Sequence, residues 1–109
     1  MPQSTVASHT TWVRAHAGCS ARVEACLSQL IEPTLQMPGC LHVALQQSRS
    51  EPLLWYVAGY WQDEASMLAY FKSPLMEVYS VLVHTRVIDR LDFQSGCDEV
   101  WSRVQKRAG

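Results

Sequence analysis

Four histidines are the only side chains in this sequence whose ordinary pKa lies near neutrality: His9, His16, His42 and His84. His9 alternates with Thr11 on one face of a predicted strand, and that face must be at least partly covered. His16 lies in a loop and His84 near the end of a helix, where ordinary surface or capping roles are expected. We therefore predict that His9 is a proton acceptor in a pocket; the alternative is a hydrogen-bonded core histidine.

Aromatic side chains gather around the predicted strand 53–61 and the helices after it. They are Trp55, Tyr56, Tyr60, Trp61, Tyr70, Phe71 and Tyr79. Such residues usually form core, but buried tyrosine and tryptophan also need partners for their polar atoms, which suits a flat, apolar ligand. Gly59 leaves a gap between large neighbours on the face of Trp55 and Trp61. That gap could admit a ligand; the alternatives are a β-bulge or close backbone packing.

The motifs of several enzyme classes are missing from the sequence. There is no G-x-G-x-x-G, Walker loop, G-x-S-x-G or H-E-x-x-H, which removes the simplest support for nucleotide, α/β-hydrolase and zincin functions. The cysteines Cys19, Cys26, Cys40 and Cys97 have no CxxC spacing, so we expect neither a metal site nor a disulfide framework. Cys26 and Cys40 are predicted to be buried, reduced thiols.

The composition indicates one globular domain. The chain has 109 residues, of which 48% are hydrophobic and 17% charged, with a net charge of -1. This balance gives no attraction for nucleic acid or an anionic membrane surface, and the thin polar cover leaves apolar surface for a partner. No apolar run reaches the length of a membrane span, and the N-terminus lacks the pattern of a secretory signal. We therefore expect a cytoplasmic protein that does not associate with membranes.

Hydrophobic periodicity predicts four strands and three helices. The strands are expected at residues 5–15, 40–47, 53–61 and 86–93. The helices are expected from residue 21, from residue 64, and from residue 74, the last two in tandem. This β-α-β-β-α-β order, with the second helical unit split in two, predicts an α+β, ferredoxin-like fold.

Turn and cap residues set the expected helix ends. Ser20 is expected to cap the first helix and Asp63 the second, while Ser73-Pro74 supplies a cap and a first-turn proline for the third. Pro33 lacks an N–H and clashes with the carbonyl of Gln29, so we expect it to interrupt the first helix. Residues 97–106 could form a terminal amphipathic helix.

Four short motifs between Ile31 and Phe93 occur in a characteristic order. They are Glu32-Pro33-Thr34, Pro38-Gly39-Cys40-Leu41, Trp61-Gln62-Asp63-Glu64-Ala65 and Ser73-Pro74. In order and spacing the chain resembles the antibiotic biosynthesis monooxygenase family of dimeric α+β barrel proteins, leaving out only the extreme N-terminus and the segment after Gly96. The resemblance implies a protomer whose sheet packs against that of a second copy, with a substrate pocket between sheet and helices.

Single residues transfer from the family only in part. Trp61 matches the family tryptophan at the end of the third strand, but Gly59 stands where an acidic residue is often found. Tyr70 stands where many members have histidine, and Ser80 aligns with a histidine of the haem-degrading branch. That branch also uses an asparagine on the first strand, and this sequence contains no asparagine. A haem-degrading mechanism of that type therefore does not transfer.

The resemblance implies oxidation of a small aromatic, quinol or polyketide-like substrate by molecular oxygen without a cofactor. We expect His9 and Tyr70 to be the catalytic residues, His9 as base and Tyr70 as a hydrogen-bonding group. The expected substrate-binding residues are Thr11, Trp55, Gly59, Trp61 and Tyr79. The alternatives are a non-catalytic ligand-binding dimer, or a lyase, isomerase or cyclase on the same barrel.

The expected assembly is a homodimer formed through the sheet faces. Strand alternation places Ser8, Thr10, Trp12 and Arg14 opposite His9, so Trp12 should lie at the subunit contact. All of residues 1–109 are expected to form a single domain, with a core at about 5–94 and a C-terminal extension at about 97–109.

Overall fold

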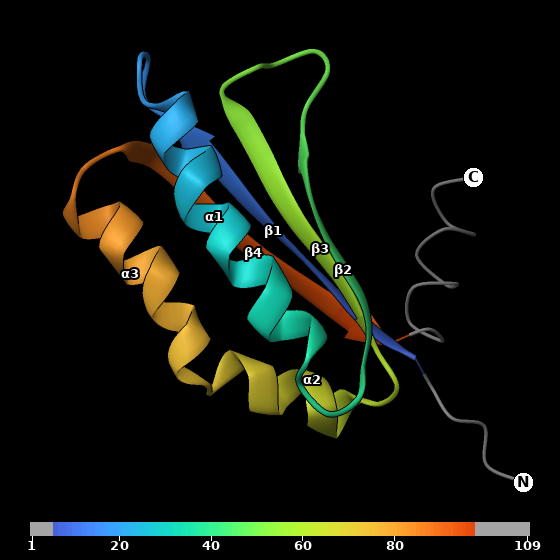
Figure 1. The fold of residues 1–109 in the computed structure, drawn as a ribbon. Coiled ribbons are helices and arrows are strands. Elements are labelled where there is room, and N and C mark those ends of the chain that lie inside the picture. The colour runs from blue at the N-terminus through green and yellow to red at the C-terminus, as the bar shows by residue number, and fades with distance from the viewer. Residues whose placement is uncertain (1–5, 98–109) are drawn as a thin grey trace, which may run out of the picture.

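The chain folds as one antiparallel sheet with helices on one of its faces (Figure 1). The computed structural model describes residues 6–97. Its elements are β1 (Ala7–Ala15), α1 (Ser20–Leu35), β2 (Cys40–Gln47), β3 (Leu54–Trp61), α2 (Glu64–Phe71), the short 3-10 helix η1 (Pro74–Met76), α3 (Glu77–His84) and β4 (Ile88–Cys97). The strand order β2-β3-β1-β4 and the split second helical unit confirm the α+β, ferredoxin-like fold.

The helices form a layer over one face of the sheet. In Figure 1, α1 and α3 lie over the sheet and run roughly along the strands, and α2 lies near the end of the sheet where β3 ends. The main core lies between the layers and includes Val13, Leu27 and Leu82. A second, smaller cluster lies beneath α2 and contains Ala7, Trp61, Met67 and Tyr70.

Strand pairing decides which side chains face the helices. His9 pairs with Gly59 on β3 and with Ser95 on β4, so these three positions share the covered face. Thr11 pairs with Val57 and is 2% exposed. The alternation predicted for residues 5–15 is confirmed from Ala7 onwards.

The opposite side, which we call the open face, carries Ser8, Thr10, Trp12 and Arg14 from β1. No element within residues 6–97 packs on it (Figure 1). The rings of Trp12 and Tyr56 lie against each other there, with centroids 4.7 Å apart. Both aromatic side chains are half-buried, and no other helix or strand of the described chain packs over them.

The predicted interruption at Pro33 is wrong, because α1 continues through Pro33 to Leu35. Pro33 lies in the last turn, so its missing N–H affects only one bond at a point where the helix is ending. The amides of Gln36 and Met37 donate to the carbonyls of Pro33 and Thr34, a tighter 3-10 pattern that ends the helix. A proline so near the C-terminal end of α1 therefore costs the helix little stability.

The caps differ in part from those expected. Asp63 caps α2, accepting a hydrogen bond from the Ser66 amide at 2.8 Å. Ser20 does not cap α1: its hydroxyl donates to the Pro52 carbonyl and accepts from the Trp55 indole N–H. Ser73 precedes η1 without a side-chain cap and donates to the Tyr70 carbonyl instead. The Ser20 hydroxyl is taken by tertiary partners, whereas the Ser73 hydroxyl is taken by a local carbonyl three residues earlier.

The last strand is shifted towards the C-terminus. β4 begins at Ile88, after Arg86 adopts a left-handed conformation with φ 60°, and it continues past Phe93 to Cys97. Pairing with β1 extends it, since Ala7 pairs with Cys97. The helix predicted for residues 97–106 lies outside the described residues except for Cys97, which belongs to β4. Within residues 6–97 no helix is long and apolar enough to cross a membrane.

Candidate functional site

His9 is buried in an aromatic cluster between the sheet and α2. Its side chain is 3% exposed. The imidazole stacks on Tyr70 with centroids 5.1 Å apart, and the ring of Phe71 meets it edge-on at 5.3 Å. The ring centroid of Trp61 lies 6.2 Å from that of His9 and 5.1 Å from that of Tyr70. Strands β1 and β3 and helix α2 thus bring together three of the predicted site residues, His9, Trp61 and Tyr70.

Gly59 makes room for the His9 ring. A Cβ atom at position 59 would lie 2.5 Å from Nε2 of His9, far inside van der Waals contact. The His9 side chain therefore occupies the gap that the sequence suggested for a ligand, so the gap holds neither a ligand nor the close backbone packing or β-bulge given as alternatives. Gly59 therefore borders the site, because it pairs with His9.

Five buried polar atoms in this region have no hydrogen-bond partner among the described residues. They are Nδ1 and Nε2 of His9, Nε1 of Trp61 and the hydroxyls of Tyr70 and Tyr79. A buried polar group without a partner costs roughly 1–3 kcal/mol. Such groups are satisfied by water or by a ligand, and their concentration here distinguishes this region from an ordinary core.

The cluster is uncharged at neutral pH. Burial lowers the pKa of His9 to about 4, so its imidazole is neutral and offers one donor and one acceptor. Burial likewise raises the pKa of Tyr70 to about 12, although the nearby hydroxyls of Thr34 and Tyr79 partly oppose this. Burial also raises the pKa of Tyr79. Both tyrosines can therefore donate hydrogen bonds.

Tyr79 and Thr11 extend this group of hydroxyls towards β4. The Thr11 hydroxyl lies near enough to Tyr79 to lower its pKa slightly against the effect of burial. The Tyr79 ring meets Phe93 edge-on with centroids 5.4 Å apart, and Phe93 pairs with Thr11 across the strands. The site thus joins α2, α3, β1 and β4.

An apolar hollow of about 360 Å³ opens beside the cluster. It is lined by Phe71, Met76, Phe93 and Ser95, and we call it the Phe71–Phe93 hollow. Phe71 touches the His9 ring, and Ser95 is the β4 partner of His9. Phe93 is half exposed at 51%. The volume lies within the range of about 300–1,000 Å³ that is typical of small-molecule sites.

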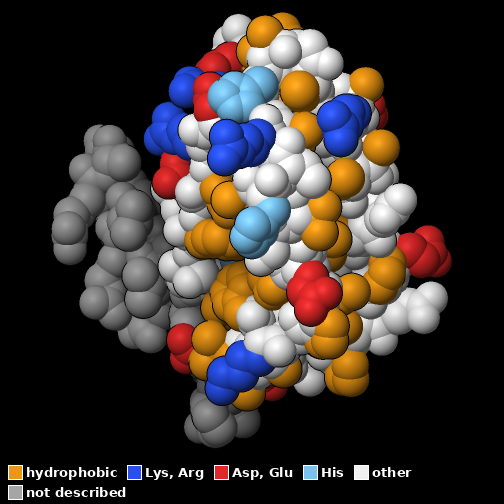
Figure 2. Space-filling model, turned by 90° about the vertical axis from the view of Figure 1, so that its left-hand side faces the viewer, with side chains coloured by type: hydrophobic (Ala, Val, Ile, Leu, Met, Phe, Trp, Pro, Cys, Tyr) orange, Lys and Arg blue, Asp and Glu red, His pale blue; other side chains and the backbone are white. Residues whose placement is uncertain are grey.

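The side of the molecule on which α3 lies is shown in Figure 2. Hydrophobic side chains run over much of this side, with charged groups scattered between them. This arrangement suits a flat aromatic molecule that carries one or two oxygen atoms.

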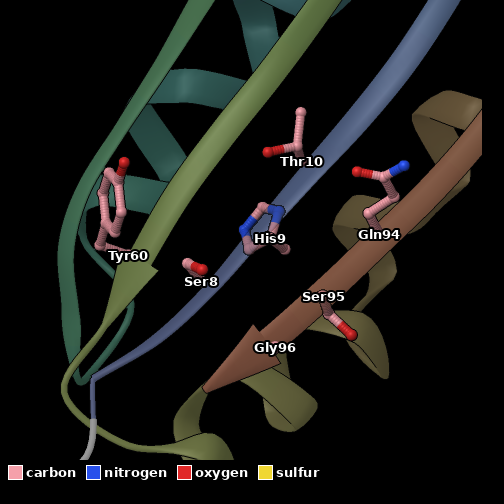
Figure 3. A pocket seen from close by; sticks show the side chains of 7 residues that line it. All are labelled: Ser8, His9, Thr10, Tyr60, Gln94, Ser95 and Gly96. Atoms are coloured by element: carbon pink, nitrogen blue, oxygen red, sulfur yellow. The ribbon is translucent and has the colours of Figure 1, made fainter. Parts of the chain in front are cut away.

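Another hollow, on the open face, is too small for such a ligand. It measures about 80 Å³ and is lined by Ser8, His9, Thr10, Tyr60, Gln94, Ser95 and Gly96 (Figure 3). Figure 3 shows His9 on β1 between β3, which bears Tyr60, and β4, which bears Gln94 and Ser95. This volume has room for a few water molecules.

Trp55 lies away from this group. It packs in the main core, and its indole N–H donates to the Ser20 hydroxyl at 2.9 Å. His16, His42 and His84 are all exposed. The structure therefore brings His9, Thr11, Gly59, Trp61, Tyr70 and Tyr79 into one region and leaves Trp55 outside it.

Phe71, Met76, Phe93 and Ser95 were not named as site residues from the sequence. The signal for Phe93 and Ser95 was available in the pairing of β4 with β1, but it required the strand to continue beyond Phe93. Phe71 follows Tyr70 at the end of α2, where ends of helices are hard to place from sequence. These four residues come together only in the folded protein.

Within residues 6–97 no group of three or more His, Cys, Asp or Glu side chains could hold a metal ion. Cys19, Cys26 and Cys40 carry free thiols and are half-buried. Burial raises the pKa of the Cys40 thiol, which reduces its reactivity as a nucleophile.

Solved structures with the same fold are similar over most of the chain. A protein of Shewanella oneidensis superimposes with a TM-score of 0.78 at 18% identity, covering 87% of this chain and 92% of the other. A candidate antibiotic biosynthesis monooxygenase of Deinococcus radiodurans gives a TM-score of 0.75 at 23% identity, covering 84% and 89%. No curated protein matches the chain.

The family model for antibiotic biosynthesis monooxygenases matches residues 9–80. The matched segment begins at His9 and includes Gly59, Trp61, Tyr70 and Tyr79, but it ends before β4. Because this match spans well over half of the sequence and the fold agrees with it, the chain belongs to the antibiotic biosynthesis monooxygenase family.

Proposed function

We propose that this protein is a monooxygenase that oxidises a small, electron-rich aromatic hydroxyl compound with molecular oxygen. The observation that carries the proposal is the set of unpartnered buried polar atoms on His9, Trp61, Tyr70 and Tyr79. They lie next to an apolar hollow of about 360 Å³ that fits an aromatic ring. Membership in the family supports the reaction type.

The reaction needs no further reductant. The ionised substrate gives one electron to O2, the two radicals combine at a ring carbon, and the resulting hydroperoxide loses water. One oxygen atom becomes a carbonyl of the product and the other becomes water, so ArH(OH) and O2 give a quinone and H2O. The protein has to bind the substrate, favour its anion and keep bulk water away.

His9 is the proposed proton acceptor. Its imidazole is neutral, which a base requires, but its low pKa makes it a weak base. Full transfer from a phenol of pKa about 10 to this histidine would cost about 8 kcal/mol at about 1.4 kcal/mol per pKa unit. The site therefore favours substrates whose hydroxyl is more acidic than that of a simple phenol.

Tyr70, Tyr79 and Trp61 are the proposed hydrogen-bond donors to the substrate oxygen. All three are almost fully buried, at 1%, 4% and 0% exposure. Donors already oriented in a water-poor site stabilise a developing anion more than water-exposed donors do. They would offset part of the cost of proton transfer to His9.

The proposed active form is a homodimer joined through the open faces of two sheets. Trp12 and Tyr56 form an aromatic pair on this face, and tryptophan and tyrosine are enriched in the centres of protein interfaces. Two copies facing each other would cover these rings. The contact would leave the Phe71–Phe93 hollow accessible, because that hollow opens on the helical side.

The proposal is tested by oxygen consumption with a panel of hydroquinones and naphthols of graded pKa. We expect uptake above the enzyme-free rate, with one oxygen atom from 18O-labelled O2 in each quinone formed, no release of H2O2, and faster turnover for the more acidic hydroxyls. A 1,4-dimethoxynaphthalene control has no ionisable hydroxyl and should not react. His9→Ala should lower turnover by about 100-fold, at the lower end of general-base effects, whereas the exposed His16→Ala should not. Absence of uptake across the panel contradicts the proposal.

A ligand-binding dimer without catalysis is the second candidate. The low basicity of His9 favours it, because the same hydroxyl and indole groups could hold an oxygenated aromatic ligand without removing its proton. Binding of the panel compounds by calorimetry, with neither oxygen uptake nor product, would favour this function. Oxygen-independent conversion of the ligand would instead indicate a lyase, isomerase or cyclase.

A further inference from the structure

Gly59 and His9 face each other on neighbouring strands with unusual closeness. Side chains at directly paired positions ordinarily have Cβ atoms about 4.5–5.5 Å apart. Here the place of a Cβ at Gly59 is only 2.5 Å from Nε2 of His9, with Cε1 at 3.1 Å and Cδ2 at 3.3 Å. The imidazole therefore does not stand upright on β1 but extends across β3.

The direction in which the His9 ring points decides how much space remains between β1 and β4. His9 is flanked on β4 by Ser95, a small residue that lines the Phe71–Phe93 hollow. The other paired neighbour of His9 on the covered face is Ser95, so a ring that could not lie over β3 would turn towards β4 and the hollow that Ser95 lines. Stacking on Tyr70 at an interplanar angle of 25° holds the ring in its present place.

We propose that Gly59 is a positioning residue: by lacking a side chain it seats the His9 imidazole over β3 and thereby keeps the Phe71–Phe93 hollow open for a ligand. Any other residue at position 59 would push the imidazole towards β4. This inference deepens the proposed function. It rests on that function in one respect, namely that the Phe71–Phe93 hollow is the ligand site. The seating of His9 by Gly59 can be tested without any substrate.

The test is a double-variant cycle followed by thermal unfolding at pH 7 and constant protein concentration. Gly59→Ala should lower the Tm by about 5 °C or more when His9 is present, because the added methyl overlaps the ring. In a His9→Ala background the same change should cause no loss, since the overlapping atoms are gone. Gly96→Ala is the matched control, because a Cβ on Gly96 meets nothing within 4 Å.

A second readout follows the imidazole itself. The His9 ring resonance is identified by its absence from the NMR spectrum of His9→Ala, and its titration is compared in the wild type and Gly59→Ala. Displacement towards the solvent-facing hollow should raise the pKa of His9 from about 4 to about 5 or higher. Gly96→Ala should leave this pKa unchanged.

Each outcome of these measurements either supports or overturns the inference. A Tm loss confined to the background with His9, together with the raised pKa, supports the inference. Equal losses in both backgrounds, no loss in either, or an unchanged pKa of His9 overturns it. If Gly59→Ala alone does not fold, folding of the Gly59→Ala/His9→Ala double variant supports the inference, and failure of that variant to fold overturns it. Neither the Tm nor the pKa of His9 depends on oxygen uptake. A failure of this inference can therefore be distinguished from a failure of the proposed function.

Discussion

Replacing His9 by phenylalanine should remove a large part of the acid sensitivity of the fold. His9 is buried and its pKa is lowered from 6.5 to about 4 by burial. Between these two values the unfolded chain binds a proton at His9 and the folded protein does not, so stability falls as the pH decreases. The contribution of neutral His9 is complete above pH 6.5 and is lost towards pH 4.

The size of the effect follows from the two pKa values. At about 1.4 kcal/mol per pKa unit, the gap between 6.5 and about 4 corresponds to about 3 kcal/mol in total. Of this, about 2 kcal/mol is lost between pH 7 and pH 5. Hydrogen bonds from the Ser66 amide and the Arg14 side chain lower the pKa values of the Asp63 and Asp89 carboxyls. The stability that these two carboxylates contribute is therefore lost at a pH lower than the range from 7 to 5.

Guanidinium denaturation at pH 7, 6 and 5 measures this directly, at one protein concentration throughout. The wild type should lose about 2 kcal/mol more unfolding free energy than His9→Phe over this range. His16→Gln serves as the control, because His16 is exposed in the loop before α1. Equal losses in the wild type and His9→Phe would refute the view that His9 is held neutral by burial.

Three further substitutions test the roles assigned to single side chains. Tyr70→Phe removes a buried, unpartnered hydroxyl, so urea unfolding should show stability unchanged or raised by up to about 1 kcal/mol, while oxygen uptake falls about tenfold or more; a clear loss of stability would mean that the hydroxyl has a partner in the fold. Trp61→Phe keeps an apolar wall, so calorimetry should show weaker ligand binding, with a smaller effect on kcat; unchanged affinity would place the ligand elsewhere. Trp12→Ala should dissociate the dimer in analytical ultracentrifugation, and a wild type that sediments as a monomer at micromolar concentration would contradict the proposed assembly.

The sheet could be predicted from the sequence because its signals are local. Alternation over residues 5–15 correctly placed His9 and Thr11 on the covered face, and the apolar run 53–61 placed Gly59 and Trp61 beside them. The order of strands and helices then defined the fold. What alternation cannot give is the end of a strand, which is why β4 was expected to stop at Phe93 when pairing with β1 carries it to Cys97.

The errors at α1 come from competition between local and tertiary effects. The penalty for proline inside a helix assumes a regular interior, but Pro33 stands two residues before the helix ends at Leu35. The cap expected at Ser20 assumed that its hydroxyl had no better partner, and the Trp55 indole provides one at 2.9 Å. The same hydrogen bond explains why Trp55 belongs to the core and not to the site.

The meaning of Gly59 was not accessible from the sequence. A glycine in a strand indicates a close approach, but whether the approaching group is backbone, ligand or side chain depends on three dimensions. The sequence could list His9 and Gly59 as candidates without showing that one fills the space left by the other. The Phe71–Phe93 hollow likewise combines the end of α2, the helix η1 and the extended part of β4.

The most direct test of the site is an anaerobic NMR titration of the tryptophan indole N–H resonances with a hydroquinone-type ligand. The indole of Trp61 has no hydrogen-bond partner within residues 6–97, whereas that of Trp55 donates to Ser20. The resonances are assigned with Trp61→Phe and Trp55→Phe. We predict a saturable downfield shift of the Trp61 N–H while the Trp55 N–H stays in place. Saturable shifts at Trp12 or Trp55 with Trp61 unmoved would contradict the location of the site.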